Sequence, residues 1–486
     1  MFSLVIKKFV IKYNSLSVST KASIWYTFAN VLVKGIALLS TPIFTRVMTT
    51  NEYGTFTIFQ SWYNIILIFT SLNIYLSGYT KGLLKFRNSI DEYTSSSLSL
   101  VILITCGWGL IYIININFWT NVFQLSPILM LAMFIELIVA PPFEFWATKS
   151  RFNYKYKKYV FASLIMSFMS VILGVITVIY CSHKVEARAY SDVFSRALIG
   201  IIILCILFTK GKTFYNKKFW LYNLKFNLPL IPHYLSNFLL NQSDRIMISR
   251  MVGNTEAAYY GIAYTISTMM NLVITALNSA FTPLIYKLID QKKAYKIKGE
   301  TAPLFILVAF LCILTMAFAP EIITIFAGRN YAQAIYVVPP ISASVYFIFV
   351  YSMFSTIEYF YQKTIRIAVA TTISAILNVT LNLYFIRIFG YYAAGYTTLF
   401  SYILLALMHF IFYRLVVKDK LGSNVEIYSL KIINICSLIV LVIMLLMALT
   451  YKILVVRYIL IILMLIIIFV KGKDIKNIII KLRSGD

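Results

Sequence analysis

Charged residues are scarce in this chain, and acidic residues are the scarcest of them. Only 13% of the 486 residues are charged and 17 are acidic, whereas 60% are hydrophobic and the mean hydropathy is +0.82. A soluble domain carries roughly a quarter of its residues as charges, so that class is excluded. Apolar runs recur at the spacing of one helix plus one loop. This pattern predicts an all-α polytopic membrane protein and excludes a transmembrane β-barrel, whose strands alternate polar and apolar residues.

Cysteine and histidine are too few and too scattered to form a metal site. The five cysteines contain no C-x-x-C pair, and the three histidines lie far apart in the sequence. We therefore predict no metal, no disulfide framework and no cofactor. A phosphate-binding loop is also missing, because Ile206 stands where the run ending in Lys210–Thr213 would need glycine. ATP is thus not the expected energy source, and a Na⁺ or H⁺ gradient is.

Long polar loops are absent as well, so function is expected to lie in the helices. The apolar runs predict about 14 transmembrane helices. The predicted segments are an N-terminal cytoplasmic stretch, a first six-helix lobe, a cytoplasmic linker, a second six-helix lobe, two further helices and a cytoplasmic tail: 1–21, 22–209, 210–224, 225–416, 417–470 and 471–486.

The distribution of lysine and arginine sets the predicted orientation. With the N-terminus in the cytoplasm, cytoplasmic segments carry about four of these residues for each one in an external loop. The asymmetry holds along the whole chain, which predicts that both termini are cytoplasmic. It also explains the net charge of +27, so no nucleic-acid partner is expected. Contact with membrane lipids is expected instead.

Two pairs of passages indicate an internal repeat. At a shift of 204 residues, Arg46 falls on Arg250 and Glu52 on Glu256. At a shift of 214, "FEFWATKSRF" (143–152) matches "IEYFYQKTIR" (357–366). An even number of helices in each copy predicts two parallel lobes related by an axis along the membrane normal.

Three passages, together with this topology, resemble the Wzx-type polysaccharide flippases of the multidrug/oligosaccharidyl-lipid/polysaccharide exporter superfamily. They are Asp244-Arg245 followed by Gly253 and Glu256, the passage 377–402, and Pro42 followed by "TTNEYGTF". The resemblance implies a transporter, not an enzyme, in a bacterial plasma membrane. It would move undecaprenyl-diphosphate-linked oligosaccharides to the outer leaflet by alternating access. Glycan polymerase or export machinery are further expected partners.

Polar side chains inside the predicted helices mark an expected cavity. A charge deep in a membrane helix costs at least about 2.5–3.5 kcal/mol, so it usually faces water or a partner. Lys34 and Arg245 are expected to hold the diphosphate, and amide or imidazole groups on shared helix faces to contact sugar. The predicted substrate-binding set is Lys34, Arg245, Asp244, Asn30, Asn241, Asn237, His233, Asn271, Asn278, Arg46 and Arg250.

Structural alternatives exist for several of these residues. Arg46 and Arg250 lie at outer helix ends, where they can simply reach towards the membrane surface. The asparagines can join helices through hydrogen bonds. Asp244 can be a structural partner that neutralises Arg245 or Lys34.

Four acidic residues are candidates for gating or ion coupling. Glu136 is followed by a helix-breaking proline pair, and Asp244 shares the seventh helix with Arg245. Glu144 and Glu358 lie at cytoplasmic helix ends and are expected to pair with lysine or arginine across the lobes. A further pair, Asp192 and Arg196, is expected to neutralise itself along one helix.

Two other functions remain open. A drug or cation antiporter of the same architecture would need an acidic, aromatic cavity, whereas the candidates here are net basic. A membrane glycan polymerase or ligase would need a sizeable external loop and catalytic side chains, and neither is evident in the sequence.

Overall fold

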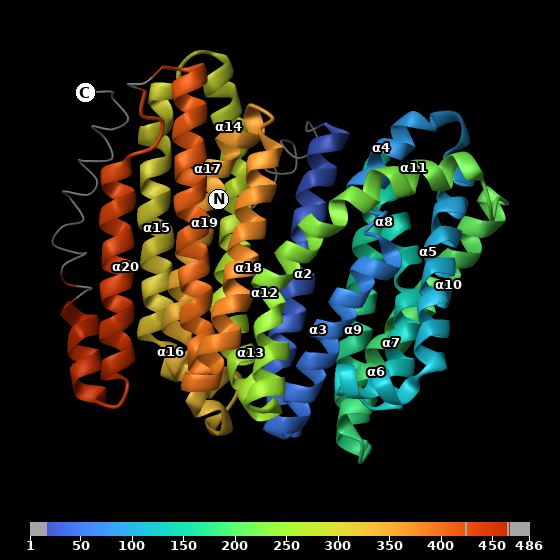
Figure 1. Cartoon of the computed structure of the whole chain (residues 1–486), viewed down its shortest axis with the longest axis horizontal. Helices are drawn as coiled ribbons and strands as arrows, with labels where there is room; N and C mark the ends of the chain where they lie inside the picture. The colour runs from blue at the N-terminus through green and yellow to red at the C-terminus, as the bar shows by residue number, and fades with distance from the viewer. Residues whose placement is uncertain (1–16, 423–424, 464–465, 467–486) are drawn as a thin grey trace, which may run out of the picture. The chain divides into compact units, whose positions relative to one another are not determined.

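The structure, a computed structural model, describes residues 17–422, 425–463 and 466, and every regular element in these ranges is a helix (Figure 1). It confirms the predicted all-α membrane fold. The chain divides into two compact units, Met1–Leu235 and Ser236–Asp486. The predicted tail at 471–486, and residues 1–16 of the predicted N-terminal segment, lie outside the described residues.

Unit 1 is built on long helices that pack side by side, with α10 against α9, α7, α5 and α8. Its elements are α2 (Val18–Val47), α3 (Thr50–Ser71), α4 (Ser77–Lys85), η1 (Arg87–Ser89), α5 (Ile90–Ile114), α6 (Ile116–Phe123), α7 (Pro127–Val139), α8 (Pro141–Phe152), α9 (Tyr156–Tyr180), α10 (Lys184–Gly211), α11 (Lys217–Asn227) and η2 (Leu228–Leu230).

Unit 2 is centred on α17, which packs against α19, α15, α13 and α20. The linking helix α12 (Ile231–Met251) begins in unit 1 and continues into unit 2. The elements that follow are α13 (Asn254–Thr268), α14 (Met270–Asp290), η3 (Ala294–Lys296), α15 (Ile297–Ala317), α16 (Ala319–Phe326), η4 (Arg329–Tyr336), α17 (Val338–Phe360), α18 (Thr364–Phe389), α19 (Tyr392–Lys420) and α20 (Leu430–Thr450).

Eleven helices of the described residues are long and apolar enough to cross a membrane, fewer than the 14 expected. Two of the missing spans are α3 and α12, which have 22 and 21 residues but are more polar. The third is the last span, of which the structure describes only the short apolar helix Leu454–Leu463. The described helices thus correspond to the predicted sequence of spans, while the count of 14 is not confirmed.

The first of the two repeat matches has the correct register. Helix α2 ends at Val47 and α3 begins at Thr50; α12 ends at Met251 and α13 begins at Asn254, each 204 residues later. At the first of these turns the Thr49 hydroxyl accepts from the backbone N–H of Glu52, whose carboxylate accepts from the N–H of Thr49. This reciprocal cap fixes where α3 starts.

The second repeat match is wrong by six residues. Helices α9 and α18 begin at Tyr156 and Thr364, and α10 and α19 begin at Lys184 and Tyr392, both 208 residues apart rather than 214. Glu144 and Glu358 therefore do not occupy equivalent positions. Short apolar windows match at several registers, and only the helix ends distinguish between them.

The segment predicted as a linker, 210–224, is largely helical. Helix α10 continues to Gly211, and α11 starts after Asn216, whose side-chain oxygen accepts from the N–H groups of Lys218 and Phe219. Helix α11 is fixed to α5, because Trp220 donates to the Ser96 carbonyl at 2.8 Å and Asn223 bonds both Tyr93 and Ser97. The segment is thus part of unit 1.

A glycine allows α10 to pack closely on α7. A Cβ placed on Gly200 would lie 2.0 Å from the backbone oxygen of Val139. We expect Gly200→Ala to destabilise the protein by about 1–3 kcal/mol or more, because backbone atoms must move. Thermal unfolding of the detergent-solubilised protein measures this. Gly107→Ala is the matched control, since a Cβ there meets nothing within 4 Å. Equal unfolding temperatures for the two variants would contradict the prediction.

Candidate functional site

Asp244 is the most buried of the predicted substrate-binding residues, with 1% of its surface exposed. Its Oδ2 accepts hydrogen bonds from the hydroxyls of Tyr260 on α13 and Thr398 on α19, the latter at 2.8 Å. Its Oδ1 accepts from the amide of Asn382 on α18 at 2.5 Å. Four helices of unit 2 therefore meet at this carboxylate, and all three of its donors are neutral.

The expected neutralisation of Asp244 by Arg245 is not found, because Asp244 forms no ion pair with a described residue of unit 2. Pairing with Lys34, which lies in unit 1, stays a prediction. The guanidinium of Arg245 instead donates to Gln242 at 2.8 Å and lies over the ring of Tyr264, 5.0 Å from its centroid. Adjacent residues on a helix point about 100° apart, which explains why the two charges do not meet.

Further oxygen atoms surround the carboxylate. Asn382 places its amide 3.4 Å from the side-chain oxygen of Asn378, one turn earlier, and accepts from Thr397. The amide of Asn378 lies 3.4 Å from the Thr398 hydroxyl. The group formed by Asp244, Asn378, Asn382, Thr397 and Thr398, which we name the Asp244 cluster, thus combines one carboxylate with four neutral oxygen-bearing side chains.

A polar cavity of about 310 Å³ lies beside this cluster in unit 2. It brings together four of the predicted asparagines, two from α12 and two from α14. The lining residues with polar side chains are Asn237, Asn241, Asn271, Asn278, Tyr351, Ser352, Thr371, Thr275 and Tyr402. We name this space the amide cavity. Its size falls within the range of small-molecule sites, about 300–1,000 Å³.

Hydrogen bonds connect the amide cavity to the Asp244 cluster. The side-chain oxygen of Asn241 accepts from the hydroxyls of Tyr264 at 3.1 Å and Tyr402 at 3.0 Å. The ring of Tyr264 stacks on that of Tyr260, with centroids 6.0 Å apart, and Tyr260 donates to Asp244. The carboxylate is thus connected to the cavity wall through Tyr260 and Tyr264, by a hydrogen bond at each end and ring stacking between them.

The remaining predicted binding residues lie elsewhere. Lys34 and Asn30 are exposed on α2 in unit 1, and Asn30 accepts from Tyr159 at 3.2 Å. His233 lies on the part of α12 that belongs to unit 1 and does not line the amide cavity. Arg46 is exposed near the end of α2, where it donates to the Pro42 carbonyl at 2.8 Å, and Arg250 is exposed near the end of α12.

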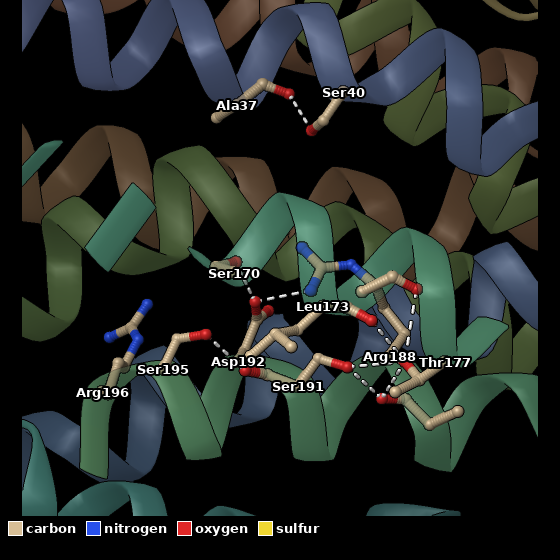
Figure 2. A network of polar contacts seen from close by, with 12 residues as sticks. Ala37, Ser40, Ser170, Leu173, Thr177, Arg188, Ser191, Asp192, Ser195 and Arg196 are labelled. Atoms are coloured by element: carbon tan, nitrogen blue, oxygen red, sulfur yellow. Dashed lines mark hydrogen bonds and ion pairs between the residues drawn. The ribbon is translucent and has the colours of Figure 1, made fainter. Parts of the chain in front are cut away.

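Unit 1 contains a separate group of charged side chains on α10, namely Arg188, Asp192 and Arg196 (Figure 2). Arg188 donates to Asp192, one turn further along, at 2.5 Å, and Ser170 of α9 also donates to this carboxylate. The guanidinium lies over the ring of Phe44, 4.3 Å from its centroid. Gly174 on α9 leaves the necessary space, because a Cβ there would be 3.0 Å from the Arg188 nitrogen.

The predicted pair of Asp192 with Arg196 is therefore wrong. Asp192 sits four residues from both arginines, and the spacing alone could not select between them. The structure pairs Arg196 with Glu136 of α7 at 3.1 Å, and its guanidinium also donates to the Tyr63 hydroxyl at 3.5 Å. Glu136, predicted as a gate or ion site, is thus an ion-paired residue, 3% exposed.

Glu358, one of the two acids expected to pair across the lobes, has a different partner. Glu358 does not pair with a lysine or arginine but lies 2.7 Å from Nδ1 of His409 on α19, within unit 2. Both side chains are fully buried. Glu144 on α8 is half-buried and forms no ion pair with a described residue of unit 1, so its pairing across the lobes stays a prediction. The expected pairing was inferred from helix ends, which do not reveal which side chains face one another.

Sequence reasoning did not identify the donors around Asp244 or the partner of Glu358. The missed residues are Tyr260, Asn378, Asn382, Thr397, Thr398, Tyr402 and His409. The asparagines at 378 and 382 are spaced by one helical turn, as were the asparagines of α12. The same rule applied to α18 would have found them.

Two family models and one curated protein match this sequence. A family model described as polysaccharide biosynthesis protein matches residues 19–289, and a second model, MatE, matches residues 229–384. Protein 1 of the Lsg locus of Haemophilus influenzae is 24% identical over 383 residues, covering 74% of this chain and 89% of that protein.

Solved transporters share the fold at lower identity. The lipid II flippase MurJ in an inward closed conformation is similar with a TM-score of 0.68 and 14% identity, over 93% of this chain and all of that one. An inward-facing multidrug resistance MATE transporter gives a TM-score of 0.64 and 14% identity, over 81% and 96% of the two chains. Because the first family model spans more than half of the sequence, the chain belongs to the polysaccharide biosynthesis protein family, the Wzx-type flippases of the multidrug/oligosaccharidyl-lipid/polysaccharide exporter superfamily.

Proposed function

We propose that this protein moves oligosaccharides linked to undecaprenyl diphosphate from the inner to the outer leaflet of a bacterial plasma membrane, with both termini in the cytoplasm. The observation that carries the proposal is the amide cavity. Amide and hydroxyl groups both donate and accept hydrogen bonds, which matches the hydroxyls of sugars. A cavity of about 310 Å³ accommodates part of a glycan rather than a whole repeat unit.

Cations would hold the diphosphate. Arg245 lies over Tyr264, whose hydroxyl bonds a residue of the cavity wall, and Lys34 is exposed on α2. A guanidinium can bind a phosphate group through two parallel hydrogen bonds, whereas an ammonium acts as a point charge. The prenyl chain remains in lipid, so that only the polar head crosses the protein.

Alternating access would be coupled to Na⁺ or H⁺ at the Asp244 cluster. A buried carboxylate surrounded by neutral donors is costly unless it takes up a proton or a cation. Hard cations prefer oxygen ligands, and the cluster supplies a carboxylate, two amide oxygens and two hydroxyls. Either ion would neutralise Asp244 and change the hydrogen bonds that reach the cavity wall.

Flipping by the purified protein tests the proposal. In proteoliposomes we expect movement of a fluorescent lipid-linked oligosaccharide between leaflets at least tenfold faster than in protein-free vesicles, and slower again once Na⁺ and H⁺ gradients are collapsed. Full activity without either gradient would exclude ion coupling. A rate equal to that of empty vesicles would refute the flippase function.

The match to the MatE model keeps export of organic cations as the second candidate. The described lining of the amide cavity contains no carboxylate, which favours a glycan over a cationic drug. Deletion of the gene separates the two functions. We expect loss of a surface glycan with unchanged drug tolerance, and the reverse result would support the antiporter.

A further inference from the structure

A second buried acid in unit 2 lies outside the site described above. Glu358, near the end of α17, and His409, on α19, are both fully buried, and Glu358 Oε1 lies 2.7 Å from His409 Nδ1. Their remaining polar atoms, Glu358 Oε2 and His409 Nε2, are also buried and have no hydrogen-bond partner in the described part of the chain. A merely structural pair would be expected to satisfy those atoms, because unpaired buried polar groups are destabilising.

The net charge of the pair limits how many protons it can bind. With one proton between them, the two groups are neutral as a pair, either as imidazolium and carboxylate or as neutral imidazole and carboxylic acid. A second proton leaves a net positive charge in the helix interior, and removal of the first leaves a net negative charge. Both states are strongly disfavoured without water. Exchange of this proton would therefore require water to reach the pair.

We propose that Glu358 and His409 form a proton-binding site that is loaded from one side of the membrane and unloaded to the other as unit 2 opens and closes. On binding, a proton from water forms an N–H or O–H bond in the pair and leaves hydroxide in solution. On release, the same bond breaks and water accepts the proton. No other reactant is needed.

Several titratable and charged side chains surround the pair. Tyr351 stacks on the imidazole of His409, and Tyr359 and Tyr413 occupy neighbouring positions on α17 and α19. Tyr286 of α14 and Tyr428 contact this end of α17 through Phe360 and the Met353 carbonyl, and Arg366 of α18 lies over Phe412 of α19. Of these groups only Arg366 carries a charge at neutral pH. Arg414 and Glu426 also lie near Tyr413, and Glu426 is ion-paired with Lys298.

Aromatic stacking connects the pair to the amide cavity. The ring of Tyr351 lies between His409, at 5.5 Å, and Tyr402, at 6.3 Å. Tyr351 and Tyr402 both line the cavity, and Tyr402 donates to Asn241. A charged imidazole attracts an aromatic face more strongly than a neutral one, so the protonation state of His409 affects the cavity wall. This coupling to substrate rests on the proposed function, whereas proton binding by the pair does not.

The small number of histidines makes a direct test feasible. With ring-¹⁵N-labelled histidine, the full-length protein gives three pairs of ring-nitrogen signals, from His183, His233 and His409, and the variants His183→Gln and His409→Gln assign them. In Glu358→Gln, which cannot share a proton with the imidazole, both ring-nitrogen shifts of His409 should change while those of His183 and His233 stay the same. An identical His409 spectrum in Glu358→Gln would overturn the proposal.

A transport measurement tests the link to the cavity. In the proteoliposome assay, Glu358→Gln and His409→Gln should each reduce the acceleration produced by a pH gradient at least tenfold, and the exposed His183→Gln should leave it unchanged. A pH dependence in both pair variants equal to that of the wild type would overturn the coupling. If the NMR result holds but the wild type moves no glycan lipid, the proton site stands and the proposed function fails. Monodisperse elution of each variant in size-exclusion chromatography shows that it is folded. Glu358→Asp, which keeps the carboxylate, serves as a second variant if Glu358→Gln misfolds.

Discussion

Replacing Asp244 by asparagine is expected to reduce glycan export at least tenfold while the protein still folds. Asparagine has the shape of aspartate, and its oxygen can accept from Asn382 while its amide donates to the hydroxyls of Tyr260 and Thr398, which can act as acceptors. The hydrogen-bond geometry thus survives, and only the charge that binds a proton or cation is lost. A tenfold loss corresponds to about 1.4 kcal/mol, a modest fraction of what an ionic ligand can contribute.

Surface glycan in a deletion strain complemented with each variant provides the measurement, with the membrane level of the protein as a reference. Asp290→Asn is the matched control, because Asp290 is exposed at the end of α14. Normal export from Asp244→Asn would show that the carboxylate has no role in coupling. Loss of the protein itself would instead show that the charge is needed for folding.

The second large effect is expected for Lys34→Ala and Arg245→Ala, each of which should abolish export at a normal protein level. Both remove a cation proposed to bind the diphosphate. They lie in different compact units. Arg245→Lys should retain part of the activity, since it keeps the charge but loses the two-pronged contact with phosphate.

Lys292→Ala controls for the removal of a positive charge, since Lys292 is exposed in the turn after α14. The single variants should have the same unfolding temperature as the wild type. Wild-type export from both Lys34→Ala and Arg245→Ala would end the assignment of these cations to the substrate.

The membrane fold was accessible from sequence because hydropathy and the distribution of lysine and arginine depend on composition, not on packing. The helical turn rule also placed Asn237 and Asn241 on one face of α12, and the amide cavity contains both. Helix α11 was not predicted, because its polar residues and lysines are typical of a loop. Its position depends on contacts with α5 that only the folded chain reveals.

The partners of the buried charges could not be predicted for a different reason. Helix periodicity gives the direction of a side chain but not the helix that faces it. Glu136 meets Arg196, and Glu358 meets His409, only because α7 packs on α10 and α17 on α19. Asp244 required even more information, since its three donors come from three separate helices.

The polarity of α3 and α12 has a consequence for how the protein is made. A translocon releases a segment into the bilayer according to its apolarity, and these two helices are less apolar than the spans around them. Their insertion is therefore expected to need help from neighbours synthesised before or after them. A turn of two residues separates α2 from α3, so the simplest route is insertion of both helices together as a hairpin. For α12, the helices that supply hydrogen bonds to Asp244 are α13, α18 and α19, and all three emerge from the ribosome after it. We therefore expect α12 to reach its final position only after the last third of the chain has been synthesised.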